Sequence, residues 1–190
     1  MVAPTKYYEK AVPTPTSFIR YKGIWDMQDL YESMAGWFRH RKYKLHEKVY
    51  KHKHPSPFGV ERQYIWQAEK KETDYEQVIY DVYMHTYDAH DIEVVMPDGA
   101  KKTFTKGRIW IELKVVLNYD WEGRWNEKLF YKYLKDFYNK YVVRKKFTQG
   151  YAPKFRTELY ELQNLIKERL KMESRGFEQR YMPGVHVRTV

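Results

Sequence analysis

The chain has 190 residues, of which 43% are hydrophobic and 32% charged, and its formal net charge at pH 7 is +10. This length and composition suit one globular domain with a buried core and exclude a disordered chain. Because the chain contains no cysteine, disulfides, cysteine-ligated zinc, iron–sulfur clusters and thiol nucleophiles are excluded. The positive charge favours an anionic partner: nucleic acid, an acidic protein or an anionic membrane surface.

No stretch approaches the roughly 18 apolar residues that a transmembrane helix needs. The N-terminus also lacks a basic region followed by an apolar run, which is the pattern of a signal peptide. We therefore expect no membrane span and no signal peptide, and a location that is intracellular, either cytoplasmic or within a virion.

Residues 1–23 contain three prolines and show neither a helical nor a strand period, which predicts an extended arm. The arm carries the aromatic residues Tyr7, Tyr8 and Phe18. Large aromatic side chains suit an interface better than a solvated tail, so we predict that these three contact a neighbouring subunit.

Residues 26–41 have the clearest helical pattern. Asp26 is suited to cap the helix, and large apolar residues then recur at helical spacing. These residues are Met27, Leu30, Tyr31, Met34, Trp37 and Phe38. The pattern predicts an amphipathic helix.

Strand-like segments follow, rich in Tyr, Ile, Val and Trp and separated by turn signals. They are residues 44–53, 60–72, 76–88 and 107–120, with a hairpin at Pro97-Asp98-Gly99. Two of them run to about 13 residues, beyond the usual strand length of about 5–6. Such a sheet would extend past its helices and offer a surface to a partner.

Two further apolar stripes at helical spacing predict helices over 125–144 and 154–173. The fold class is therefore α+β: an antiparallel meander of about 4–6 strands, preceded by one amphipathic helix and followed by two. Helices would cover one face of this sheet. We divide the chain into the arm (1–23), a single α+β domain (24–173) and a loose C-terminal tail (174–190).

Residues 38–55 are strongly basic, with seven Lys/Arg and four His around a single acid, Glu47. If 44–54 is a strand, alternation places His46, Lys48, Tyr50, His52 and His54 on one face. Three interpretations stay open: a solvated strand face, a metal site at His52 and His54, and a phosphate-binding surface. The neighbouring cations disfavour a divalent metal. The candidates for polyanion binding are Arg39, Arg41, Lys42, Lys44, Lys48, Lys51 and Lys53.

The second face of the predicted sheet is mixed. Alternation in 76–88 and 107–120 puts Tyr83, Tyr87 and Trp110 on it, together with Asp81 and Glu112. Aromatic platforms on a sheet stack nucleic-acid bases or pack against protein. We favour a protein interface because carboxylates in the same rows would repel phosphate.

His85, Asp88 and His90 lie close together in the sequence and are weak candidates for a metal or acid–base site, although their spacing matches no known metal motif. The chain has no nucleophile-elbow, phosphate-loop or dinucleotide fingerprint, and we predict no cofactor. The sequence favours a non-enzymatic assembly subunit of a virion, filament or ribonucleoprotein, which binds protein neighbours through its arm and aromatic sheet face. The alternatives are a nucleic-acid-binding module using 38–54 and a metal-dependent enzyme at His85, Asp88 and His90.

Overall fold

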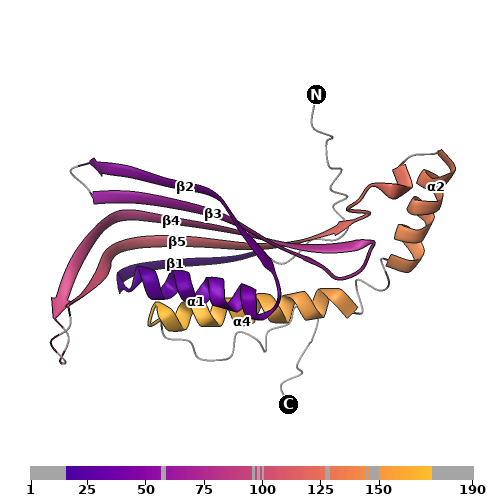
Figure 1. Ribbon diagram of the computed structural model, residues 1–190. Helices are drawn as coiled ribbons and strands as arrows, with labels where there is room; N and C mark the ends of the chain where they lie inside the picture. The colour runs from indigo at the N-terminus through magenta and orange to yellow at the C-terminus, as the bar shows by residue number, and fades with distance from the viewer. Residues whose placement is uncertain are drawn as a thin grey trace, which may run out of the picture.

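A computed structural model of the protein describes residues 16–56, 59–95, 97, 99, 101–126, 129–143, 145 and 150–172 (Figure 1). The strands are β1 (Thr16–Trp25), β2 (Lys44–Ser56), β3 (Gly59–Lys71), β4 (Glu76–Val95) and β5 (Lys101–Tyr119). The helices are α1 (Met27–His40), α2 (Leu129–Tyr138) and α4 (Ala152–Arg169), with a 3-10 turn η1 (Arg124–Asn126) and a π-helical segment η2 (Asn139–Val143).

The strands form one antiparallel sheet in the order β1-β5-β4-β3-β2. The predicted α+β class and the antiparallel meander, here β2 to β5, are confirmed. The order of the first elements is corrected, because α1 follows β1 instead of preceding the whole sheet. Residues 16–23 of the predicted arm thus belong to a strand, while Tyr7, Tyr8 and the tail 174–190 lie outside the described residues.

Strand β1 exists because its residues alternate between a buried and an exposed face. Ser17, Ile19 and Trp25 are buried, while Phe18 and Arg20 are exposed. The strand pairs along its whole length with β5. Arg20 and Lys22 interrupt the apolar pattern of β1, so the alternation is not evident in the sequence. The partner strand β5 lies about 90 positions further along the chain, and local sequence patterns do not reveal such a distant pairing.

Both α1 and α4 lie on the same face of the sheet, which we call the helix face (Figure 1). Helix α1 begins after Asp26, whose side chain accepts a hydrogen bond from the backbone N–H of Asp29 at 3.0 Å, so the predicted cap is confirmed. Helix α4 has proline in its first turn, where its missing N–H costs nothing.

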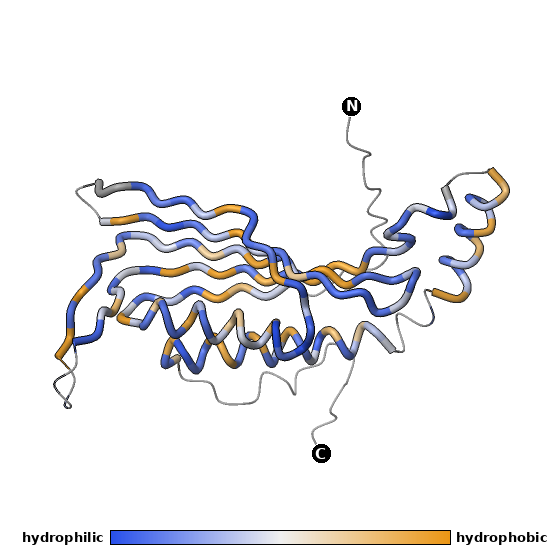
Figure 2. The backbone as a smooth tube through the Cα atoms, viewed as in Figure 1, coloured by the Kyte–Doolittle hydropathy of each residue, from blue (hydrophilic) through white to orange (hydrophobic). Residues whose placement is uncertain are grey.

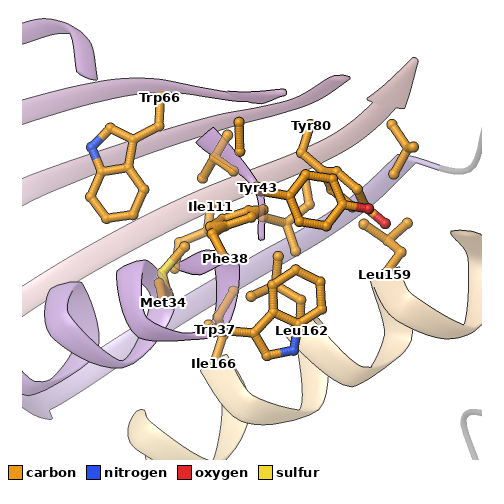
Figure 3. Close-up of a cluster of buried hydrophobic side chains, with 14 of the residues drawn as sticks. Met34, Trp37, Phe38, Tyr43, Trp66, Tyr80, Ile111, Leu159, Leu162 and Ile166 are labelled. Atoms are coloured by element: carbon orange, nitrogen blue, oxygen red, sulfur yellow. The ribbon is translucent and has the colours of Figure 1, made fainter. Parts of the chain in front are cut away.

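The core lies between these helices and the helix face. Alternate residues of β4 and β5 enter it as predicted: Val78, Tyr80, Val82 and Met84 from β4, and Ile109, Ile111, Leu113, Val115 and Leu117 from β5. The ring of Tyr80 lies 5.7 Å from that of Phe38 and 5.1 Å from that of Tyr43, centroid to centroid, in edge-on contacts (Figure 3).

A polar contact fixes α4 to this aromatic cluster. The hydroxyls of Tyr43 and Tyr80 both donate to one carboxylate oxygen of Glu158, at 2.9 and 3.1 Å. Burial raises the pKa of both tyrosines, and the negative charge of Glu158 adds to this for each of them. The hydroxyls therefore stay protonated and remain donors across the accessible pH range.

Three glycines and a β-bulge lie on a line across four strands. Gly23 of β1 is opposite Gly107 of β5, and Gly107 faces the register shift in β4 between Tyr87 and His90. A Cβ on Gly107 would lie 2.9 Å from the carbonyl oxygens of Tyr87 and Asp88, and one on Gly59 only 2.8 Å from the Asp88 backbone. Glycine allows this close approach, and beyond the line β4 and β5 curve away from the ends of β2 and β3 (Figure 1).

We expect Gly107→Ala to lower the free energy of unfolding by about 1–3 kcal/mol, because the new methyl group meets backbone atoms that cannot rotate away. Gly36→Ala is the matched control. Gly36 lies within α1, and a Cβ there meets no atom of the described residues within 4 Å, so this change should stabilise the protein by about 0.5–1 kcal/mol. Urea unfolding of both variants measures the difference, and equal effects would contradict the close approach at Gly107.

Candidate interaction surface

The face of the sheet opposite the helices, which we call the outer face, carries no helix over its middle among the described residues (Figure 1). The register defines rows of side chains that point the same way across all five strands. One row is Phe18, Glu112, Tyr83, Ile65 and Val49, and the next is Arg20, Trp110, His85, Gln63 and Lys51. The predicted interface residues Phe18, Tyr83, Tyr87 and Trp110 therefore share this face.

The first row is predominantly apolar. Phe18 is 56% exposed and Ile65 36% exposed, while Tyr83 and Val49 are half-buried. Glu112 is the one charged residue in this row. We call these five residues the apolar row. Sequence reasoning found Phe18 and Tyr83 but missed Ile65 and Val49, which only the strand register brings into line with them.

Aromatic and cationic side chains meet in the second row. The guanidinium of Arg20 lies 5.1 Å from the centre of the Trp110 ring, and Tyr83 approaches the same ring edge-on at 6.5 Å. The indole Nε1 of Trp110 is buried and has no hydrogen-bond partner among the residues that the structure describes. Beside Trp110, a hollow of about 450 Å³ also has Tyr87, Lys22 and Arg108 among its walls.

The three weak metal candidates have separate surroundings. His85 is buried, with Nδ1 3.2 Å from the Tyr83 hydroxyl and Nε2 3.3 Å from the Gln63 amide. Asp88 lies in the β4 bulge and forms an ion pair with Arg108, and His90 is exposed opposite Lys106. Among the described residues, no group of three or more His, Asp or Glu side chains is placed to hold a metal ion.

Burial lowers the pKa of His85, although the neighbouring carboxylate of Glu61 opposes this. In the unfolded chain the pKa of His85 has its ordinary value of about 6.5. Just below pH 6.5 the unfolded chain therefore binds more protons than the folded protein does. His85 therefore makes the free energy of unfolding fall as the pH drops from about 6.5 toward the lower folded-state pKa.

Replacing this residue should remove its part of the pH dependence. We expect His85→Gln, which retains polar atoms near Tyr83 and Gln63, to lose less stability than the wild type between about pH 7.5 and 5.5. His90→Gln, at an exposed position, should keep the wild-type slope. Urea unfolding at the two pH values tests this, and an unchanged slope in His85→Gln would show that His85 is not responsible.

The basic stretch divides into two groups. Arg39, Arg41 and Lys42 lie at the end of α1, where Lys42 adopts a left-handed φ of 62° in the turn to β2. Arg41 forms an ion pair with Glu161, and its guanidinium lies 4.2 Å from the centre of the Trp37 ring. Lys44, Lys48, Lys51 and Lys53 lie along β2, and Lys53 pairs with Glu61 at 3.5 Å.

The predicted alternation along this strand is wrong. A register shift between Glu47 and Val49 reverses the faces, so that Tyr50 opposes Tyr64 on the helix face while His46 opposes Gln67 on the outer face. His46 and His52 are therefore on different faces, since His52 opposes Arg62, two residues from Tyr64. The side chain of His54 lies outside what the structure describes.

Strand β2 ends the order of the sheet among the described strands, so one side of its backbone has no strand beside it. Lysines on such an edge prevent pairing with another chain, because pairing would bury their charge. The four lysines of β2 fit this protective role without any phosphate contact.

Two triple variants separate edge protection from polyanion binding. We expect Lys48→Thr/Lys51→Thr/Lys53→Thr to aggregate with rising concentration, because threonine favours strand pairing. The matched variant with Glu at all three positions should stay unaggregated, since a negative charge also protects an edge. Light scattering gives the aggregation, and oligonucleotide titration at low salt gives the binding. Strong wild-type binding that the Glu variant loses would instead support a phosphate contact.

A groove of about 440 Å³ lies on the helix face between α1 and the sheet. Its central charges satisfy each other: Arg62 binds Asp91 through two hydrogen bonds, and Thr105 donates to Asp91 at 2.9 Å. The hydrogen bonds from Arg62 lower the pKa of Asp91, and those to Asp91 raise the pKa of Arg62. Both groups stay charged and paired, so this cluster links β3, β4 and β5.

The helix predicted over 125–144 forms in part, as α2, but it does not cover the sheet. It stands at the end of the molecule beyond β5 (Figure 1). The apolar side chains that we expected to pack on the sheet are mostly exposed: Leu129, Phe130, Tyr133, Leu134, Phe137 and Tyr141. The apolar spacing therefore predicted the helix correctly, but the expected burial of its apolar side chains against the sheet is wrong.

No protein-family model and no curated protein sequence matches this chain. Among the described residues, no helix is long and apolar enough to cross a membrane.

Proposed function

We propose that the protein is a non-enzymatic subunit of a larger assembly and that the outer face of its sheet packs against a neighbouring protein subunit. The observation that carries this proposal is the apolar row, which runs across five strands on a face that no described helix covers over its middle. Aromatic residues next to exposed aliphatic ones are typical of the centre of a protein interface.

The charges around the apolar row favour protein over nucleic acid. Glu112 lies within the row, and Asp81 follows in the adjacent row beside Lys114. Phosphate groups would meet these carboxylates at close range, whereas a protein surface can supply complementary charges of both signs. A second copy of the chain offers such complementary charges, because Arg20 of each copy would pair with Glu112 of the other across a two-fold axis.

The rest of the structure offers few of the features of a catalytic site. The buried His85 is held by Tyr83 and Gln63, and Arg62 in the helix-face groove is held by Asp91. These groups act as structural contacts and do not converge on a common reacting atom.

Light scattering over a range of concentrations tests the assembly of this chain with itself. We expect the wild type to reach a multiple of 23.4 kDa, and Phe18→Asp/Ile65→Asp to remain at 23.4 kDa. Phe18 is mostly exposed, but Ile65 is only 36% exposed and Asp is disfavoured in strands, so the double substitution should lower the free energy of unfolding by about 1–2 kcal/mol. A retained cooperative urea transition shows that the variant is folded when its mass is measured.

Val95→Asp is the matched control, because Val95 is also an exposed aliphatic residue but lies at the end of β4, away from the apolar row. It should associate like the wild type. A wild-type mass of 23.4 kDa at every concentration, or equal loss of association in the control, would contradict self-assembly through this face.

A further inference from the structure

Helix α2 is attached to the body by its polar side. Lys135 is buried and its Nζ lies 3.4 Å from the buried Asp120, while Asn139 accepts a hydrogen bond from the Tyr75 hydroxyl at 2.7 Å. Tyr138 stacks on Trp125 with a ring separation of 6.2 Å. A helix of this composition normally buries its apolar side against the core, whereas here Tyr138 and Val143 contact the body and most of the other apolar side chains do not.

The opposite side of α2 and η2 is apolar and exposed. Leu129, Tyr133 and Phe137 recur every four residues, which places them on one side of the helix. The exposed fractions of the apolar residues here lie between 39% and 70%. We call these residues the α2 stripe: Leu129, Phe130, Tyr133, Leu134, Phe137, Tyr141 and Val142. Hydrophobic positions can be followed along α2 in Figure 2.

The size of the α2 stripe limits what can cover it. With about 200 Å² for a large exposed side chain, the seven residues expose on the order of 800 Å², more than the largest apolar patch of a typical monomer. A second α2 would contact the helix from one direction and bury roughly half of this. A stable dimer needs about 800 Å² from each partner, so a pair of α2 helices is too small on its own.

The charges next to the stripe indicate an anionic partner. Residues 129–145 contain five Lys/Arg and one acid, Asp136, and of the five cations Lys135 is already paired with Asp120. Four Lys/Arg therefore face this single acid. Lys132 and Lys140 are exposed, and the Nζ of Lys140 lies 5.6 Å from the centre of the Tyr141 ring. A short helix with aromatic and leucine residues on one side and lysines beside them is typical of helices that lie in a lipid interface, where tyrosine is also favoured.

We propose that the α2 stripe binds the surface of an anionic lipid membrane, with α2 lying in the plane of the interface. The position of α2 at one end of the molecule allows this, because it projects away from the sheet and the other helices (Figure 1). A bilayer also has no shape to match, so it can cover the whole stripe where a second helix cannot. The proposal is independent of the outer face.

Flotation of the full chain with vesicles tests the proposal. One set of vesicles contains phosphatidylcholine alone, and the other contains phosphatidylcholine with one quarter phosphatidylglycerol. We expect binding to the anionic vesicles, weakened by added salt, and at least tenfold weaker binding to the neutral ones. Phe130→Asp/Phe137→Asp should reduce binding to the anionic vesicles at least tenfold.

Two controls keep the result interpretable. The side chains of Phe130 and Phe137 are 70% and 59% exposed, so circular dichroism should show an unchanged thermal transition in the double variant. Phe18→Asp/Ile65→Asp introduces the same charge on the outer face and should leave vesicle binding unchanged. A loss of binding in both double variants would overturn the assignment to α2.

Three further results would overturn the proposal. The first is a wild type that does not float with anionic vesicles. The second is equal flotation of Phe130→Asp/Phe137→Asp, which would assign the binding to basic residues alone. The third is self-association of the wild type that this double variant abolishes, without flotation of either, which would assign the α2 stripe to a second copy of the chain.

Discussion

The mismatch in length between the sheet and its helices determines the rest of this structure. Helices of 14 and 18 residues span about 21 and 27 Å, whereas the 20 residues of β4 span about 65 Å. Two helices on one face can therefore bury only part of that face. The rest of the helix face and the whole outer face must be covered by other contacts.

Particular residues make these contacts or let the uncovered part of the sheet bend. On the helix side, Arg62, Asp91 and Thr105 satisfy one another in the groove between α1 and the sheet. The line from Gly23 through Gly107 lets β4 and β5 curve. On the outer face, aromatic and charged side chains cover one another in pairs such as Arg20 and Trp110. In the apolar row, Phe18 and Ile65 stay exposed.

The sequence predicted features that depend on local spacing. The period of two in 76–88 and 107–120 identified both faces of β4 and β5, and with them Tyr83, Tyr87 and Trp110. The period of a helix identified α1 and its cap at Asp26. Sequence reasoning failed where the deciding contact is distant: β1 is defined by pairing with β5, and the bulge at Lys48 reverses the faces of β2. The helical spacing of apolar residues also predicted α2. That spacing does not reveal whether the rest of this domain or a separate partner covers the apolar side of the helix.

If the outer face is buried against protein in the cell, hydroxyl-radical labelling of its side chains will show it directly. The side chains of Phe18, Tyr83 and Trp110 would be labelled in the source cells and in the purified, dilute protein. Tyr50, which is 52% exposed on the helix face and lies outside both the apolar row and the α2 stripe, is the internal reference. We expect Phe18, Tyr83 and Trp110 to be protected in cells relative to the dilute protein. Equal labelling in the two samples would contradict it.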